Sequence, residues 1–204
     1  NVKYGVFDGD KMIASWRVST KASRTADEYG MVLYDLLRQR GVNFEDIDAC
    51  VMSSVAPALN YTIEHMCNDY IGKSPLIVSC DTDTGITLDY AQPTQLGTDR
   101  IVGAAAAYAI YGGPVIVVDF GSATTFNLVT KDGRYLGGAI APGIKTATES
   151  LVTTAAKLPR IELEKPQNIV GRDTKSCMQS GIVYGYAGRV QYRVEKYKPL
   201  DEMK

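Results

Sequence analysis

The segment VIVVDFGSATTFNLVTKDG, residues 115–133, is the clearest indicator of the fold class of this 204-residue chain. Its first four residues form an apolar run that predicts a buried strand, and 126–130 predicts a second strand that returns towards a turn at Asp132-Gly133. Small and short polar residues lie between the strands, and an acid, Asp119, stands at the carboxyl end of the first strand. The segment therefore predicts a strand, a small-residue turn and a second strand in direct succession.

The N-terminal part of the chain repeats this order. Val2 to Val18 alternates apolar and polar residues on both sides of Asp8-Gly9-Asp10, which predicts two antiparallel strands joined by a tight turn. Asp132-Gly133 corresponds to Asp8-Gly9 as the next turn in the same order, which indicates a duplicated supersecondary unit. A complete first copy would need its own strand and acid-plus-glycine turn before Asn1, so we expect the N-terminus to be truncated.

The chain between these units alternates helical and strand patterns. Thr25 and Glu28 match a capping box at the start of a helix that extends to Leu37. The other expected elements are strands over 49–53 and 75–79 and helices over 59–70 and 99–111. This alternation predicts an α/β fold with mixed sheets. We place a domain boundary at Gly112-Gly113-Pro114, which gives an N-terminal domain over 1–112 and a C-terminal domain over 113–204.

Composition excludes several classes of function. The 22 basic and 23 acidic residues are interleaved, so the charge pattern indicates neither a nucleic-acid partner nor a membrane surface. No stretch reaches the run of about 18 apolar residues that a membrane span needs. We therefore expect a cytoplasmic protein whose partners include no nucleic acid and no membrane.

The cysteines and the single histidine give no recognisable zinc cluster. The four cysteines contain no CxxC pair, and His65 with Cys67 makes only half of a ligand set. We expect buried or reduced thiols. One histidine also leaves little room for a Ser-His-Asp mechanism, whereas Asp, Glu and Lys remain available for proton transfer.

The tetrapeptide Gly97-Thr98-Asp99-Arg100 is the first candidate for chemistry. A carboxylate next to a guanidinium at a loop-to-helix junction offers a base and an anion clamp side by side, close to helical N–H groups that favour negative charge. The alternative is structural: Thr98 or Asp99 caps the Ala-rich helix and Arg100 is solvated.

The second candidate is the turn from Asp119 to Thr125. Ligands bind at the carboxyl ends of strands in open α/β sheets, and here Gly121 gives room while Ser122 and Thr124 or Thr125 supply hydroxyls. Asp119 could bind a cation through its carboxylate oxygens. The alternative is a hairpin whose hydroxyls bond their own backbone. The chain contains neither a Walker loop nor a GxGxxG motif.

A third cluster, Gly137 to Gly143, either lines a ligand or packs two elements closely, and packing is the favoured interpretation.

Taken together, these motifs resemble the type III pantothenate kinases. The matching segments are NVKYGVFDGD at 1–10, RTADEYG at 24–30, SSVAP at 53–57, GTDRI at 97–101, DFGSATTFN at 119–127 and GGAIAPGI at 137–144. This family is part of the acetate and sugar kinase, actin-like ATPase superfamily. The resemblance implies two ribonuclease H-like domains, with mixed sheets flanked by helices. It also implies ATP-dependent phosphorylation of pantothenate to 4'-phosphopantothenate, the first step of coenzyme A biosynthesis.

The resemblance also implies which residues bind pantothenate. Gly97, Thr98, Asp99 and Arg100 would form the substrate site, with Asp99 as the base that takes the proton from the primary hydroxyl and Arg100 paired with the carboxylate. Tyr90 matches a substrate-contacting aromatic position. Thr174 matches a threonine supplied across the interface of a homodimer.

On the phosphate-donor side, the resemblance implies ATP with Mg²⁺ and a monovalent cation, K⁺ or NH₄⁺. Asp119 matches the ligand of the monovalent cation, and Ser122 stands where the family usually has a threonine that contacts the ATP phosphates. Lys3 is the last residue of the family's DxGNTN(V/I)K phosphate turn, of which only Asn1-Val2-Lys3 is present.

At the other end, the family continues beyond the helix expected over 181–195 into a glycine-rich segment, so we also expect truncation there. Two alternatives stay open. One is a non-catalytic regulatory homologue that resembles the Bvg accessory factor, and the other is a sugar or acetate kinase of the same superfamily. The intact GTDR favours the pantothenate kinase over the regulator, and GTDR with GGAIAPG argues against the other kinases.

Overall fold

The computed structural model describes residues 1–21 and 23–198, and it divides into two compact units. The first unit contains 1–81 and 97–99, and the second contains 82–96 and the residues from Arg100 onwards. Each unit is described by itself. The boundary expected after Gly112 groups the residues differently, and the extent of the folding domains stays a prediction.

The first unit begins with the expected hairpin. Strands β1 (Val2–Asp8) and β2 (Lys11–Val18) pair antiparallel, with a bulge between Val6 and Phe7. Gly9 has a φ of 55°, which is the left-handed conformation that a tight turn requires and that glycine adopts without strain. The hairpin predicted from the Asp-Gly sequence is therefore confirmed.

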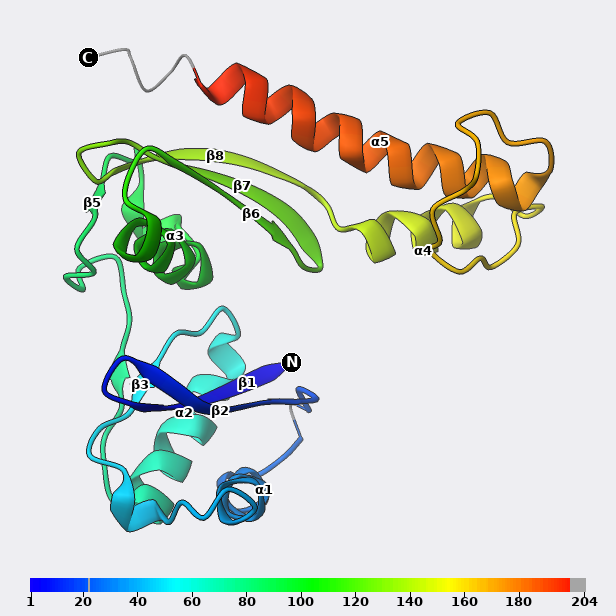
Figure 1. The fold of residues 1–204 in the computed structure, drawn as a ribbon. Coiled ribbons are helices and arrows are strands. Elements are labelled where there is room, and N and C mark those ends of the chain that lie inside the picture. Colours follow the sequence, from blue (N-terminus) through cyan, green and yellow to red (C-terminus); the bar gives the residue numbers. More distant parts are fainter. Residues whose placement is uncertain (22, 199–204) are drawn as a thin grey trace. The chain divides into compact units, whose positions relative to one another are not determined.

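Two helices supply the core of the first unit (Figure 1). In α1 (Ala26–Arg38), Thr25 and Glu28 form the predicted capping box, since each side chain bonds the other's backbone N–H. Helix α2 (Pro57–Met66) continues into a π-helical turn (Cys67–Ile71). The buried residues of the core are Tyr29, Leu33, Leu37, Leu59, Met66 and Cys67. Because Tyr29, Leu33 and Leu37 are spaced four apart, they form the apolar face of α1.

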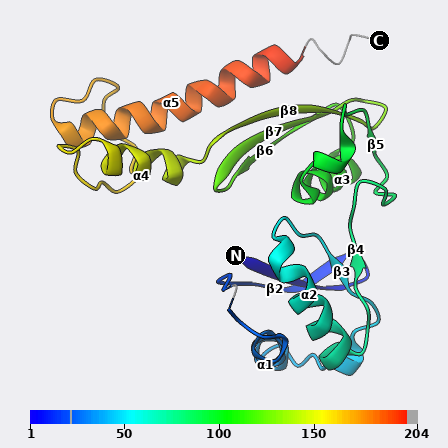
Figure 2. The same cartoon turned by 180° about the vertical axis from the view of Figure 1, so that it is seen from behind.

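Helix α2 also connects two parallel strands. Strands β3 (Val51–Met52) and β4 (Leu76–Ile77) pair parallel, and Figure 2 shows them side by side. The strand–helix–strand order predicted here is confirmed, although both strands are shorter than the expected 49–53 and 75–79. A short 3₁₀ helix (Phe44–Asp46) precedes β3.

The second unit is built on a four-stranded mixed sheet with the order β5-β8-β7-β6. The strands are β5 (Thr87–Leu88), β6 (Val115–Phe120), β7 (Ala123–Val129) and β8 (Arg134–Pro142). Strand β5 pairs parallel with β8, whereas the β6–β7 and β7–β8 pairs are antiparallel. The predicted mixed sheet and the turn at Asp132-Gly133 are confirmed. A 3₁₀ helix (Pro93–Gln95) follows β5.

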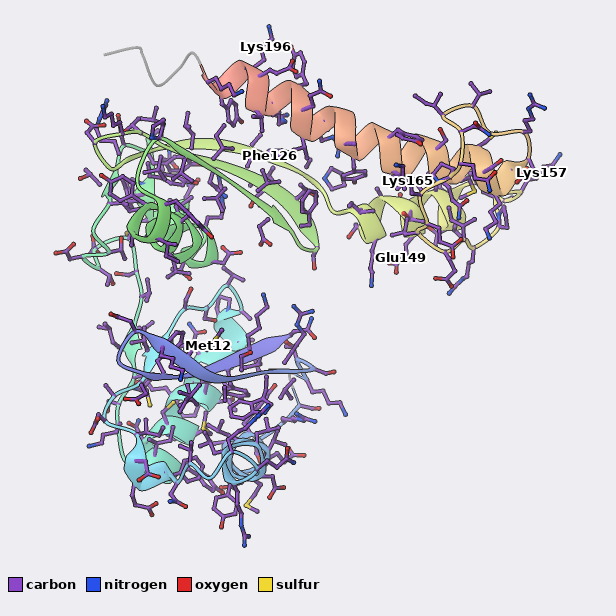
Figure 3. All side chains as sticks on the ribbon, viewed as in Figure 1. Met12, Phe126, Glu149, Lys157, Lys165 and Lys196 are labelled. Atoms are coloured by element: carbon purple, nitrogen blue, oxygen red, sulfur yellow. The ribbon has the colours of Figure 1, made fainter. Side chains whose placement is uncertain are left out.

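Neighbouring residues of β7 show what covers each face of the sheet. Asn127 accepts a hydrogen bond from Arg100 of α3 (Thr98–Tyr111), so its side chain faces α3. Phe126, labelled in Figure 3, lies with its ring centroid 5.2 Å from Cζ of Arg193 on α5 (Thr174–Tyr197). Because side chains alternate along a strand, α3 and α5 contact opposite faces.

The last two helices follow β8. Helix α4 (Ile144–Thr154) begins directly after Gly143, and α5 begins after Asp173, whose carboxylate caps it by accepting from Ser176 N. Tyr186 of α5 donates its hydroxyl to the carbonyl of Pro142 at 2.8 Å. The helix expected over 181–195 is present, but it starts earlier, at Thr174. No helix in the described part of the chain is long and apolar enough to span a membrane.

Gly138 of the glycine cluster packs β8 closely against β7, as the favoured interpretation expected. A Cβ on Gly138 would collide with the backbone carbonyl of Phe126 on β7. We therefore expect Gly138→Ala to lower the free energy of unfolding by about 1–3 kcal/mol, because backbone cannot move aside as a flexible side chain would.

The matched control for this substitution is Gly185→Ala in the middle of α5, where a Cβ meets no atom within 4 Å. It should raise stability by about 0.5–1 kcal/mol, since alanine is the better helix former. Urea unfolding of both variants measures the difference. Equal stabilities of the two variants would contradict this packing argument.

Candidate active site

The Gly97–Asp99 segment is held by the first unit. The Thr98 hydroxyl donates to the Ser54 carbonyl at 3.0 Å and accepts from the Ser53 hydroxyl at 3.0 Å. Ser53 and Ser54 follow β3 directly, so this strand positions the Gly97–Asp99 segment within the first unit. Asp99 is exposed in the first turn of α3.

Gly97 leaves space for that carboxylate. A Cβ built on Gly97 would lie 2.5 Å from Oδ1 of Asp99, which is closer than real Cβ contacts. Glycine at this position therefore permits the orientation of the Asp99 side chain, and any larger residue would displace it.

Arg100 belongs to the second unit and is buried, with 9% of its surface exposed. Its Nε donates to Oδ1 of Asn127 at 2.7 Å, and Cζ lies 5.9 Å from the centroid of the Tyr135 ring. The solvated arginine of the structural alternative is thus not what the fold produces. Arg100 is instead fixed against the sheet.

Tyr90 contacts Tyr135, the residue that Arg100 also contacts. Its ring meets Tyr135 edge to face with centroids 6.1 Å apart, and a Cβ on Gly137 would lie 3.1 Å from the Tyr90 ring. Tyr135 is fully buried and also donates its hydroxyl to Asn127 at 2.8 Å. Tyr90 and Arg100, which are separated in sequence, are therefore brought together by Tyr135.

The turn between β6 and β7 is braced by the start of α4. The Ser122 carbonyl accepts from Gly143 N at 3.0 Å and from the Thr146 hydroxyl at 2.9 Å. A Cβ on Gly143 would lie 2.5 Å from the same carbonyl oxygen, so glycine is needed for this approach. The backbone of the turn is fixed while the side chains of Asp119 and Ser122 are exposed.

The two threonines of this turn differ in exposure. Thr124 is fully buried, and its hydroxyl has no hydrogen-bond partner within the described residues. Thr125 is half-buried and accepts from Nδ2 of Asn127 at 3.2 Å. Only Thr125 of the pair is thus accessible to a ligand at the surface.

One face of the sheet connects these groups. Thr125 and Asn127 lie two residues apart on β7 and so share a face, and Asp119 on β6 is the cross-strand partner of Thr125. Arg100, Asn127, Thr125 and Asp119 therefore follow one another along that face. A cationic group stands at one end of this row and an anionic group at the other.

Two expected site residues lie elsewhere. Lys3 is exposed on β1 in the first unit, opposite Arg17 of β2. Thr174 is the exposed first residue of α5, and Figures 1 and 2 place the start of α5 at the far end of the second unit from β5 and α3. Within one chain, Thr174 does not join the group around Arg100.

The thiols and the histidine form no metal centre. The cysteines are free, and burial raises the pKa of Cys67 to about 12, which keeps it a neutral thiol. His65 stacks on Tyr61 with ring centroids 3.9 Å apart. Over residues 1–21 and 23–198, no three His, Cys, Asp or Glu side chains gather as a metal site.

Comparison with known families assigns the chain. The family profile for type III pantothenate kinases matches residues 1–196. The chain belongs to this family. It is an ATP-dependent enzyme that phosphorylates pantothenate at the start of coenzyme A biosynthesis, and membership implies ATP with a divalent metal ion.

This kinase also has a distant structural similarity. A solved structure from Campylobacter jejuni, described as a Baf family transcriptional activator, shares 21% sequence identity with it. The alignment covers 74% of this chain and 67% of that one, with a TM-score of 0.47. A similarity this low supports no functional assignment, so the regulatory alternative gains nothing from it.

Sequence patterns did not single out Asn127 and Tyr135 as site residues of this kinase. Asn127 is quoted within DFGSATTFN, but its position carries no motif of its own. The available signal was its polarity inside the apolar stretch Phe126 to Val129, because a buried polar side chain in a strand requires partners.

Proposed function

We propose that this kinase binds pantothenate at Gly97, Thr98, Asp99, Arg100 and Tyr90 and uses Asp99 as the general base. The observation that carries this proposal is the group of Tyr90, Arg100 and Asn127 around Tyr135. A guanidinium fixed beside an aromatic ring suits a substrate with a carboxylate on an otherwise uncharged body. Pantothenate has this character.

Asp99 is chemically suited to the base role. Phosphoryl transfer proceeds in line through a loose transition state, so the enzyme contributes mainly positioning and charge neutralisation. The primary hydroxyl loses its proton late, and an ordinary carboxylate can accept it without an unusual proton affinity. The space at Gly97 permits the orientation that the Asp99 carboxylate has in the structure.

On the donor side, the proposal assigns Ser122 and Lys3 to the ATP phosphates and Asp119 to a monovalent cation, K⁺ or NH₄⁺. The exposed carboxylate at the end of β6 and the exposed hydroxyl on a braced turn fit these oxygen-binding roles. A divalent ion, which we propose to be Mg²⁺, would neutralise charge on the ATP phosphates when bound. In this proposal, Ser122 and Lys3 hold the ATP phosphates in position for transfer to the pantothenate hydroxyl.

The proposal also includes the fold of each domain, the location and assembly of the protein, and a role for Thr174. Each of the domains 1–112 and 113–204 has a ribonuclease H-like fold. The protein is a cytoplasmic homodimer, and Thr174 contacts pantothenate bound to the partner subunit. The exposure of Thr174 at the start of α5, remote from Arg100 of its own chain, is consistent with this role.

Substrate choice tests the proposed function. The full chain is incubated with ATP labelled at the γ-phosphate, Mg²⁺ and K⁺, and with pantothenate, acetate or a hexose as acceptor. We expect label to transfer to pantothenate alone. Preferential labelling of acetate or hexose would refute the pantothenate site, and tight pantothenate binding without transfer would indicate the regulatory alternative.

A substitution next to the base tests its positioning. Gly97→Ala should lower kcat by about 10- to 100-fold, because the added methyl displaces the Asp99 carboxylate from the reacting hydroxyl. Steady-state kinetics and thermal unfolding measure activity and stability separately. Gly103→Ala in α3, where a Cβ meets no atom within 4 Å, is the control. An unchanged kcat in Gly97→Ala would contradict this account of the glycine.

A further inference from the structure

Asn127 has the partners of a residue that orients another side chain. Only 2% of its surface is exposed, and its carbonyl oxygen accepts from Arg100 Nε at 2.7 Å and from the Tyr135 hydroxyl at 2.8 Å. Its amide nitrogen donates to Thr125 Oγ1 at 3.2 Å. These three bonds connect α3, β7 and β8 through one side chain.

The bonds also fix which way the amide points. If the amide were reversed, its NH₂ group would face Nε–H of Arg100, which can only donate, whereas the hydroxyls of Tyr135 and Thr125 can either donate or accept. A buried donor left without an acceptor costs about 1–3 kcal/mol, so the observed orientation is strongly preferred. The Asn127 carbonyl is thus a fixed acceptor for the Nε edge of Arg100.

Fixing Nε orients the whole guanidinium, because the group is planar and its remaining N–H bonds lie in the same plane. Tyr135 adds to this, since its ring lies beside the Arg100 guanidinium and its hydroxyl holds the Asn127 oxygen. Tyr90 contacts the same ring edge to face. The position of Arg100 therefore depends on Asn127 and Tyr135 together.

The charge of the acceptor matters as much as its position. An aspartate of nearly the same shape would accept the same bond from Nε, but its negative charge would offset the positive charge of Arg100 at short range in a buried site. A neutral amide orients the guanidinium without placing a negative charge beside it. Asparagine therefore suits a site whose substrate brings the carboxylate.

We propose that Asn127 is a positioning residue for pantothenate, which orients Arg100 towards the substrate carboxylate without neutralising it. This inference rests on the proposed function, because it assumes that Arg100 binds the carboxylate. The inference gives the buried Asn127 amide a role and explains why an uncharged residue, rather than an aspartate, suits this position. It also assigns Tyr135 as the second support of the same arginine.

The test compares two ligands that differ in charge. Calorimetry of the full chain measures Kd for pantothenate and for pantothenol, in which a primary alcohol replaces the carboxylate. Asn127→Asp should weaken pantothenate binding by about 10-fold or more and pantothenol binding by less than about 3-fold, because only the carboxylate senses the charge of Arg100. Asn127→Ala should weaken pantothenate binding as well, through loss of orientation.

Controls separate positioning from folding. Thr148→Val removes a buried hydroxyl that donates to the Ile144 carbonyl within α4, so it should lower stability and leave the ratio of the two Kd values unchanged. Thermal unfolding verifies that each variant is folded. If Asn127→Ala does not fold, the nearly isosteric Asn127→Asp still decides the question, since its expected effect is selective for the charged ligand.

Each outcome has a distinct meaning. If wild type does not prefer pantothenate over pantothenol, or if Arg100→Gln keeps the preference, the assumed role of Arg100 is wrong and the proposed function fails there. If Arg100→Gln abolishes the preference but Asn127→Asp keeps it, the role of Arg100 stands and the inference about Asn127 is overturned. Loss of the preference in both variants supports the inference.

Discussion

Asp99→Asn is expected to lower kcat by about 10²- to 10⁴-fold, which is the usual contribution of a positioned general base. Asparagine keeps the size and polarity of the side chain but cannot accept the proton of the primary hydroxyl. Because Asp99 is exposed in the first turn of α3, the substitution should change neither the fold nor the Kd for pantothenate by much. Single-turnover transfer from labelled ATP measures the rate.

The control for this prediction is Asp35→Asn, which changes an exposed aspartate on α1 in the first unit. Its kcat should match wild type. Near-normal turnover in Asp99→Asn would remove Asp99 from the base role and leave it a substrate-orienting residue at most.

Asp119→Asn should abolish the stimulation of activity by K⁺ and lower the rate at saturating K⁺ by about 10²- to 10³-fold, the range for losing one electrostatic contact to a developing charge. The reason is that an amide binds a monovalent cation more weakly than a carboxylate does. Initial rates across a K⁺ titration, with the ionic strength held constant by a tetraalkylammonium salt, measure the dependence.

Wild type should show saturable activation by K⁺ in the same titration. If the variant keeps the wild-type K⁺ dependence, the cation does not bind at Asp119. If wild type shows no K⁺ dependence at all, the proposed monovalent cation is wrong for this kinase.

Local sequence signals predicted the local structure well. The Asp8-Gly9 turn and the Thr25–Glu28 capping box each involve residues a few positions apart, and both are present. Such features depend on backbone preferences and short-range hydrogen bonds, which a pattern of residues encodes directly.

The supports of the site could not be predicted in the same way. Arg100 and Asn127 are 27 positions apart, and the Ser122 carbonyl meets Thr146 across 24 positions. These contacts arise when α3 and α4 pack on the sheet, and no local pattern records which polar groups then meet. Sequence motifs predicted candidate ligand-binding residues, whereas the structure was needed to find what holds Arg100.

The sequence pattern also could not predict which residues of the β6–β7 turn are exposed. Thr124 and Thr125 are the same residue type, so the sequence does not distinguish them. The alternation of side chains along β7 buries Thr124 and leaves Thr125 half-buried. Register relative to the neighbouring strands decides which of them can reach a ligand.

We propose that this chain transfers phosphate from ATP to pantothenate with Asp99 as base. The most direct measurement follows ¹⁴C-labelled pantothenate in the presence of ATP, Mg²⁺ and K⁺, with wild type and Asp99→Asn in parallel. We predict that wild type accumulates labelled 4'-phosphopantothenate and that the variant binds pantothenate but forms almost none. Pantothenate that binds to wild type and stays unphosphorylated, or equal product formation by the variant, would contradict it.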